Sequence, residues 1–329
     1  MLLPTPCGPV SGQMNDLMVG RTTRSTATRP TTDRSVIEDR DQQLALWTAY
    51  ELSYRGFADV HPDREWDLEV LGLRAEIEAR FERELRSVTR DRTGRVADDT
   101  PLGDELLDMV AGDEGPRLSA YLRRDATAEE MRDFLRERSI QQLKESDPQS
   151  FLLPRLEGAA KVALAEIQYD EYGAGRVQNL HQTMYARTLE AVGLDPQYGA
   201  YVEEVSAVSL ASANVMSLFA LHHRLRGAGL GHFAAFEASS SVPSRRIAAG
   251  LQRLEMAPEA GAYFDEHVEA DSVHEQVAAR DVCGSFVADH LSLRQDVIFG
   301  AACALYLDAR SGTELLERWE SGRLQDQAS

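Results

Sequence analysis

The stretch YFDEHVEADSVHEQVA, residues 263–278, decides how the rest of this 329-residue chain is interpreted. His267, Asp271 and His274 stand four and three residues apart in it. On a helix, which turns by about 100° per residue, these three side chains fall within roughly 60° of one another. Two imidazoles and a carboxylate on one face form a ligand set that suits iron or manganese, and zinc less well without thiolates. The stretch therefore predicts a metal site on a helix; the alternative is a solvated acidic helix that carries two histidines.

Charge and cysteine content restrict the partners and the compartment. The formal net charge of −19 disfavours nucleic acid and anionic membranes as partners. Three cysteines without a CxxC pair argue for a reduced environment and against a thiolate metal site. No apolar run is long enough to cross a bilayer, and MLLPTPCGPV at the N-terminus lacks the features of a signal peptide. We therefore expect a cytoplasmic protein.

The spacing of apolar residues predicts an all-α fold. No stretch shows the strict alternation of a half-buried strand, and no strand–helix–strand rhythm appears. Thr127, followed by Glu129 and Glu130, is typical of a capped helix start, so a helix is expected over residues 127–145. Residues 1–40, rich in Thr, Ser, Arg and Pro, predict a disordered arm.

The longest periodic segment covers residues 199–239. We expect Pro243 to end it, because proline lacks the backbone N–H that a helix interior requires. Gly227, Gly229 and Gly231 are expected to bend it.

A second group of metal-binding residue types lies in residues 161–185, where Glu166, Asp170 and Glu171 precede two glycines and His181 follows them. On an unbroken helix Glu171 and His181 would stand about 15 Å apart, too far for one ion. The glycines can kink the chain and shorten this distance. The alternative is a solvated acidic face with a structural histidine.

A third candidate is Glu237, which stands in GHFAAFEASSS, residues 231–241. A carboxylate among apolar residues is costly to ionise unless it is paired or bound to a cation. In a purely structural interpretation its partner is His232 or Arg245.

Taken together, three helical segments present carboxylates and imidazoles toward one another. Such sites between the helices of a bundle hold pairs of iron or manganese ions. Ferritin-like proteins would carry paired Glu-x-x-His motifs, and this chain has none. That absence argues against a ferritin-like bundle.

The chain resembles the haem-oxygenase-like diiron oxidases and oxygenases, also called iron-containing redox enzymes. The residues that carry the resemblance are ALWTAYELSYRGF (45–57), LKESDP (143–148), PRLEGAAK (154–161), EIQYDEYGAGR (166–176) with His181, RLRGAGLGHFAAFE (224–237) and HVEADSVHE (267–275). The resemblance implies a haem-oxygenase-like seven-helix bundle with extra N-terminal helices. We expect auxiliary helices in residues 41–126 and the diiron core in residues 127–329.

The resemblance also implies a ligand set for two iron ions. Matched position by position, the implied metal ligands are Glu171, His181, Glu237, His267, Asp271 and His274. A further carboxylate from an earlier helix is implied as well. Glu145 matches it, with Glu137 as the competitor. Candidate supporting groups around these ligands are Asp170, Gln178, His232 and Glu275.

The resemblance implies activation of O2 as co-substrate by two Fe ions, and oxidation of a small molecule in bacterial natural product biosynthesis. N-oxygenation of an amino-acid-derived amine is our first expectation, with Arg224, Arg226 or Arg245 as candidate substrate contacts. Desaturation or oxidative C–C cleavage of an amino or fatty acid by the same site is the second. A non-catalytic helical binding protein is the alternative of another class. A homodimer and, where the reaction requires one, an external electron donor are the expected partners.

Overall fold

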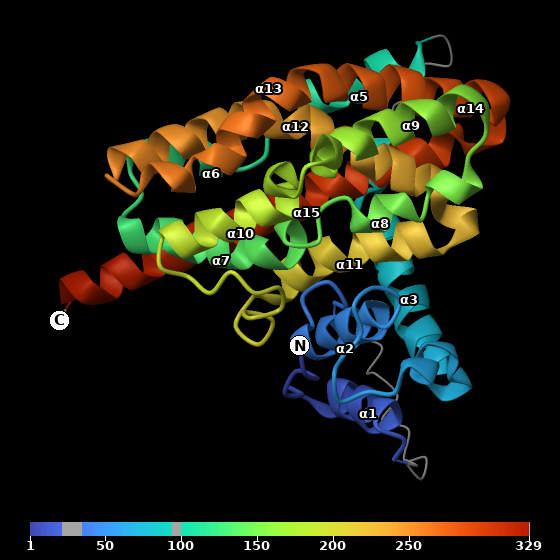
Figure 1. Cartoon of the computed structure of the whole chain (residues 1–329), viewed down its shortest axis with the longest axis horizontal. Helices are drawn as coiled ribbons and strands as arrows, with labels where there is room; N and C mark the ends of the chain where they lie inside the picture. The colour runs from blue at the N-terminus through green and yellow to red at the C-terminus, as the bar shows by residue number, and fades with distance from the viewer. Residues whose placement is uncertain (22–34, 94–99, 329) are drawn as a thin grey trace.

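A computed structural model describes residues 1–21, 35–93 and 100–328, without the side chains of 269–272 and 326–328. The helices run Pro9–Met18 (α1), Arg40–Glu51 (α2), Leu68–Val88 (α3), Arg90–Thr93 (α4), Leu102–Ala111 (α5), Leu118–Arg124 (α6), Ala128–Gln142 (α7), Asp147–Ser150 (α8), Gly158–Glu171 (α9), His181–Ala191 (α10), Ala207–Leu221 (α11), Arg226–Arg253 (α12), Ala262–Gln276 (α13), Ser285–Asp289 (α14) and Arg294–Ala328 (α15) (Figure 1). No strand occurs in these described ranges, so the predicted all-α class is confirmed.

The centre of the bundle is the packing of α12 against α15. A Cβ on Gly231 would lie 1.8 Å from the carbonyl oxygen of Val297, and a Cβ on Gly300 would lie 1.9 Å from that of Ala228. Only glycine permits so close an approach of two backbones. The three glycines expected to bend the segment all lie inside α12, where Gly231 allows the two central helices to touch.

The long segment also ends elsewhere than expected. The helix predicted over residues 199–239 is broken at His222, whose backbone is extended (φ −103°, ψ 116°), and α12 then starts at Arg226. Pro243 lies inside α12 and does not end it. Loss of one helical hydrogen bond at proline is offset here because α12 is held by α6, α13 and α15 along its length.

The N-terminal helices α1, α2 and α3 lie at one side of the bundle (Figure 1). Met14 and Met18 of α1 are buried, and the carboxylate of Asp41 accepts hydrogen bonds from the backbone N–H groups of Val10 and Ser11. Residues 9–18 therefore form a docked helix, contrary to the expected disordered arm. Although the arm as a whole is polar, Val10, Met14, Leu17 and Met18 follow a helical period and form the buried face of α1. The part of the expected arm at 22–34 lies outside the described residues.

The helix α7 brings the chain to the candidate site. Its predicted cap is confirmed, because the Thr127 hydroxyl accepts from the N–H of Glu130 while the Glu130 carboxylate accepts from the N–H of Thr127. The helix ends at Gln142, three residues earlier than expected. Ser146 then adopts a left-handed conformation (φ 68°), which places Glu145 in the turn before α8.

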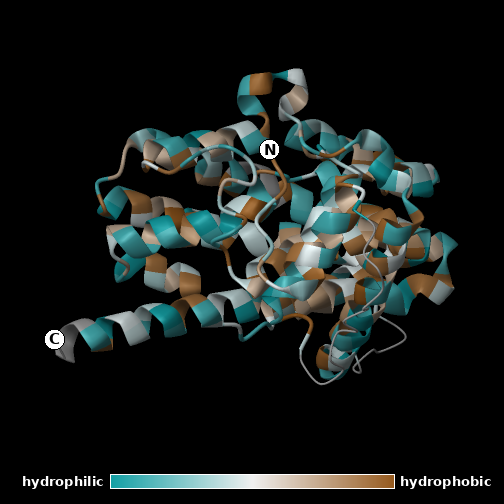
Figure 2. Ribbon diagram, turned by 90° about the horizontal axis from the view of Figure 1, so that it is seen from below, coloured by the Kyte–Doolittle hydropathy of each residue, from teal (hydrophilic) through white to brown (hydrophobic). Residues whose placement is uncertain are grey.

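At the other end of the chain, α15 extends beyond its neighbours (Figures 1 and 2), and residues 320–325 are exposed. Among the described helices, none combines the length and the apolar character needed to cross a membrane.

Candidate metal centre

Buried carboxylates and imidazoles gather in two groups inside the bundle. The first group consists of Glu145, Glu171, His181 and His267, and the second group of Glu171, Glu237 and His274. In each group one nitrogen or oxygen per residue lies within 4.8 Å of the others. All six side chains are buried. The structure thus brings together residues from the turn after α7, the end of α9, the start of α10, and α12 and α13.

Glu171 belongs to both groups. Its Oε2 lies 2.8 Å from Nδ1 of His181, and its Oε1 lies 3.5 Å from Nδ1 of His274. One carboxylate therefore turns its two oxygens toward two different sets of ligands. A carboxylate in this position could contribute an oxygen to a metal site in either group.

The turn between α9 and α10 explains how Glu171 and His181 meet. Gly173, Ala174 and Gly175 all have positive φ values, of 74°, 50° and 79°. A Cβ on Gly173 would lie 2.6 Å from the backbone of Asn179, so glycine is required there for steric reasons as well. As predicted from the sequence, these glycines bring the two ligand candidates together. The helix α10 starts at His181 itself.

Hydrogen bonds fix which nitrogen each imidazole presents. Nδ1 of His267 lies 2.7 Å from the carbonyl oxygen of Tyr263, which leaves Nε2 facing Oε1 of Glu145 at 3.5 Å. Nε2 of His274 lies 3.4 Å from Asp170, and its Nδ1 faces Glu171 and Glu237. Metal-binding histidines characteristically donate their second N–H to a carbonyl or carboxylate in this way.

The pKa values of Glu171 and His274 are shifted by their contacts with other buried carboxylates and imidazoles. Burial raises the pKa of Glu171, but the positive charge of His181 and the contact with His274 lower it well below its usual range. Burial lowers the pKa of His274, but its contacts with Glu171 and Glu237 raise it to about 11. Protonated imidazoles thus balance the carboxylates, a role that a bound cation would take over.

The residues present fit iron. Nδ1 of His181 is fully buried and, within the described residues, makes no hydrogen bond of acceptable geometry although Oε2 of Glu171 is 2.8 Å away. Once the imidazole loses its proton, this nitrogen and this oxygen would both direct lone pairs toward a bound cation. The donor set of imidazole nitrogens and carboxylate oxygens suits iron.

Three neighbouring residues support the ligand candidates, and sequence reasoning missed them. The Tyr263 hydroxyl donates to Oε2 of Glu145 at 2.8 Å, and Gln142 Nε2 donates to the Tyr263 hydroxyl at 2.9 Å. The Ser146 hydroxyl donates to Oε2 of Glu171 at 3.1 Å. The available signal was position, since Tyr263 stands one helical turn before His267 and Ser146 follows Glu145.

The remaining candidates are placed as follows. The side chain of Asp271 lies outside the described residues. Glu137, the competitor of Glu145, accepts from the hydroxyl of Ser209 and pairs with Arg318, and it belongs to neither group. Among the candidate supporting groups, Asp170 contacts His274, whereas Gln178 is exposed.

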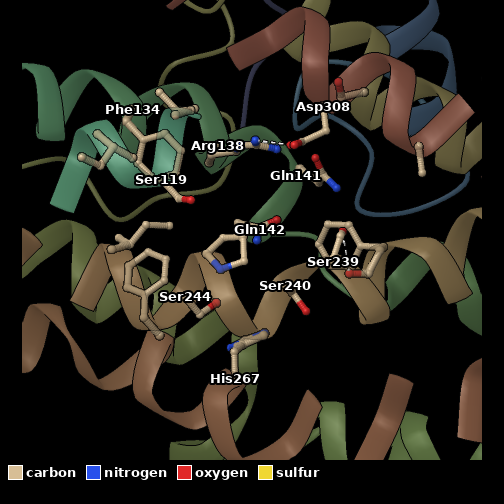
Figure 3. Close-up of a pocket in the computed structure, with 18 of the residues that line it drawn as sticks. Ser119, Phe134, Arg138, Gln141, Gln142, Ser239, Ser240, Ser244, His267 and Asp308 are labelled. Carbon is tan, nitrogen blue, oxygen red and sulfur yellow. Dashed lines mark hydrogen bonds and ion pairs between the residues drawn. The ribbon is translucent and has the colours of Figure 1, made fainter. Parts of the chain in front are cut away.

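A pocket of about 190 Å³ adjoins the first group (Figure 3). Its wall includes His267 and Tyr263 of α13, together with serines and glutamines from α7 and α12. His232, another candidate supporting group, also lines it, and burial lowers the pKa of this imidazole to about 4. Of the ligand candidates with described side chains, His267 is the one that lines the pocket.

Comparison with known proteins identifies the family. The sequence pattern of the iron-containing redox enzymes matches residues 132–309, more than half of the chain. The chain belongs to the iron-containing redox enzyme family. This finding confirms the predicted resemblance and indicates an iron-containing oxidoreductase with a haem-oxygenase-like all-α fold.

The chain is also similar to nitrosourea synthase from Streptomyces achromogenes subsp. streptozoticus. The two are 28% identical over 133 residues, which are 40% of this chain and 28% of the relative. The matched part therefore spans little more than a quarter of that protein's length.

Proposed function

We propose that this iron-containing redox enzyme is a non-haem diiron oxidase or oxygenase that acts on a small molecule. The observation that carries the proposal is the position of Glu171 between the two groups. One iron would be held by the first group. The other would be held by the second group, with Asp271 as an additional ligand. When bound, two ferrous ions supply the activation of O2 for oxidation of an organic substrate.

The contribution of the protein is orientation and exclusion of water. The carbonyl of Tyr263 and the carboxylate of Asp170 fix His267 and His274 with one nitrogen directed inward. The hydroxyl of Tyr263 holds one oxygen of Glu145, so that the other is directed toward His267. Buried ligands held in this way keep their geometry when the metal changes charge.

N-oxygenation of an amino-acid-derived amine is the reaction that we favour. The similarity to a nitrosourea synthase supports it, because a nitrosourea carries an oxidised nitrogen. Desaturation or oxidative C–C cleavage would use the same metal ligands and is the second candidate. We further propose that the protein acts in bacterial natural product biosynthesis in the cytoplasm. We also propose that it is a homodimer and that it uses an external electron donor.

The proposal is tested by mixing the anaerobic, Fe(II)-loaded protein with O2 in a stopped-flow spectrometer. A transient visible absorption that wild-type protein forms and His274→Ala does not form would support a diiron oxygenase. Glu166→Ala is the matched control, because Glu166 is exposed on α9 and should leave the reaction unchanged. A protein that neither binds iron nor consumes O2, with His274→Ala indistinguishable from wild type, would instead be a helical binding protein.

A further inference from the structure

The pocket beside the first group carries one pair of opposite charges. Among its lining residues in the described part of the chain, Arg138 is the only lysine or arginine and Asp308 the only carboxylate. Nη2 of Arg138, on α7, donates to Oδ1 of Asp308, on α15. Figure 3 shows this pair at one end of the pocket and His267 at the opposite end. A molecule that binds the pair can thus extend toward the candidate metal centre.

The pair has unused hydrogen-bonding capacity. Within the described residues, Nε and Nη1 of Arg138 make no hydrogen bond, and only one oxygen of Asp308 is engaged. The Arg138 side chain is 19% exposed, whereas that of Asp308 is 65% exposed. The guanidinium is thus held inside the pocket with donors still available, while the carboxylate stands at the rim.

A guanidinium next to a carboxylate is complementary to a molecule with a carboxylate next to an ammonium group. Guanidinium groups bind carboxylates through two parallel hydrogen bonds, and a carboxylate accepts from an ammonium group. An α-amino acid holds both groups on one carbon atom. A simple amine, a simple acid or a fatty acid would match only half of the pair.

We propose that Arg138 and Asp308 bind the carboxylate and the ammonium group of an α-amino acid substrate, whose side chain extends toward His267. This inference rests on the proposed function, since it specifies the substrate of that same site. It places the oxidised atom on the side chain of the amino acid and away from its α-nitrogen.

The pocket wall between the two ends agrees with this orientation. Ser240 and Gln142 lie between the charged pair and His267 in Figure 3. The Ser240 hydroxyl donates to the carbonyl oxygen of Glu237, whereas Oε1 of Gln142 is buried and accepts no hydrogen bond within the described residues, so it can accept one from a polar side chain. The arginines expected from the sequence are not placed for this role. Arg224 pairs with Glu82 at the surface, Arg245 is exposed, and neither they nor Arg226 line the pocket.

The competing explanation is that Arg138 and Asp308 only tie α7 to α15. Binding measured without turnover distinguishes the two. The Fe(II)-loaded protein, kept anaerobic, is titrated with each of the twenty L-amino acids, and binding is followed by calorimetry. The tightest ligand is then compared with its decarboxylated amine and with the acid that lacks the α-amino group. We expect each analogue to bind about 10- to 100-fold more weakly, as for loss of a charged hydrogen-bond partner.

Variants of the two residues test separately how the carboxylate and the ammonium group of the ligand are bound. Arg138→Gln should abolish the preference for the amino acid over its amine, and Asp308→Asn should abolish the preference over the deaminated acid. Arg138→Lys, which keeps the charge, should retain part of the preference. Arg136→Gln is the matched control, because Arg136 lies on the same helix but does not line the pocket.

The proposal is overturned if no amino acid binds, if the analogues bind equally well, or if the variants lower thermal stability without changing the binding ratios. Iron content is measured on the same samples. If the diiron proposal is wrong, the protein will bind fewer than two irons per chain. If only the amino-acid proposal is wrong, the iron stoichiometry will be two and only the ratios of the affinities for the amino acid and its analogues will differ from those expected.

Discussion

Oε2 of Glu171 lies 2.8 Å from Nδ1 of His181, at the junction of the two groups. The other oxygen of the same carboxylate faces His274. Replacing a ligand that belongs to one group only should therefore weaken the binding of one ion, whereas replacing Glu171 should weaken the binding of both.

Glu237→Ala tests this division. Glu237 belongs only to the second group, so the variant should bind one Fe(II) per chain where wild type binds two. The measurement is an anaerobic iron titration. Glu166→Ala, an exposed position, should retain both ions. An unchanged stoichiometry in Glu237→Ala would exclude Glu237 as a ligand.

Tyr263→Phe removes the hydroxyl that donates to Glu145 and keeps the ring against His267, at a centroid distance of 4.2 Å. We expect the Fe(II) affinity of the first group to fall about 10-fold, the lower end of the effect of residues that orient ligands. Competition with a coloured chelator measures it. Equal affinities in variant and wild type would show that the hydroxyl does not orient Glu145.

Gly173→Ala should disturb both stability and metal binding. Alanine in a left-handed conformation costs about 1–2 kcal/mol. The new Cβ would also lie 2.6 Å from the backbone of Asn179. Gly175→Ala is the matched control, because it has a similar φ of 79° but open space around the Cβ.

Urea unfolding and the iron titration are measured on both glycine variants. Gly173→Ala should lose more stability and more iron affinity than Gly175→Ala, since only the former pushes His181 away from Glu171. The explanation of the turn is wrong if the two variants behave alike.

The pH dependence of stability reports on His232. The folded chain holds this imidazole neutral, with its pKa lowered to about 4 by burial, whereas the unfolded chain protonates it below its usual pKa of 6.5. Between these values the unfolded state binds more protons, so the free energy of unfolding falls as the pH falls. From pH 7 to pH 5 this contribution is about 2 kcal/mol.

Replacement His232→Gln should remove that contribution. Urea unfolding of the iron-free protein at pH 7 and pH 5 measures the difference, which should be smaller in the variant by about 2 kcal/mol. An equally steep dependence in both proteins would show that His232 is not held neutral in the fold.

The parts of the structure that local sequence determines could be predicted. Thr127 and Glu130 cap a helix through contacts within four residues, and Gly173 and Gly175 have the conformations that a sharp turn requires. His267 and His274 share a helix, so their spacing alone places them on one face. These features depend little on the remainder of the chain.

The parts that depend on tertiary packing could not be predicted. Pro243 was expected to end the long helix and Gly231 to bend it, yet both lie inside α12, which packs closely against α15 at Gly231. The role of Tyr263 depends on Glu145, 118 residues earlier in the chain. Nothing in the local sequence around Arg138 indicates that it meets Asp308, 170 residues later, in a pocket.

The central claim is that one carboxylate joins two iron sites. The most direct test is anaerobic Fe(II) titration of wild type and Glu171→Ala, with bound metal measured after removal of free ions. The account predicts two Fe(II) per wild-type chain and weakened binding of both in the variant. A wild-type chain that binds one ion or none, or a Glu171→Ala variant that binds two with unchanged affinity, would contradict it.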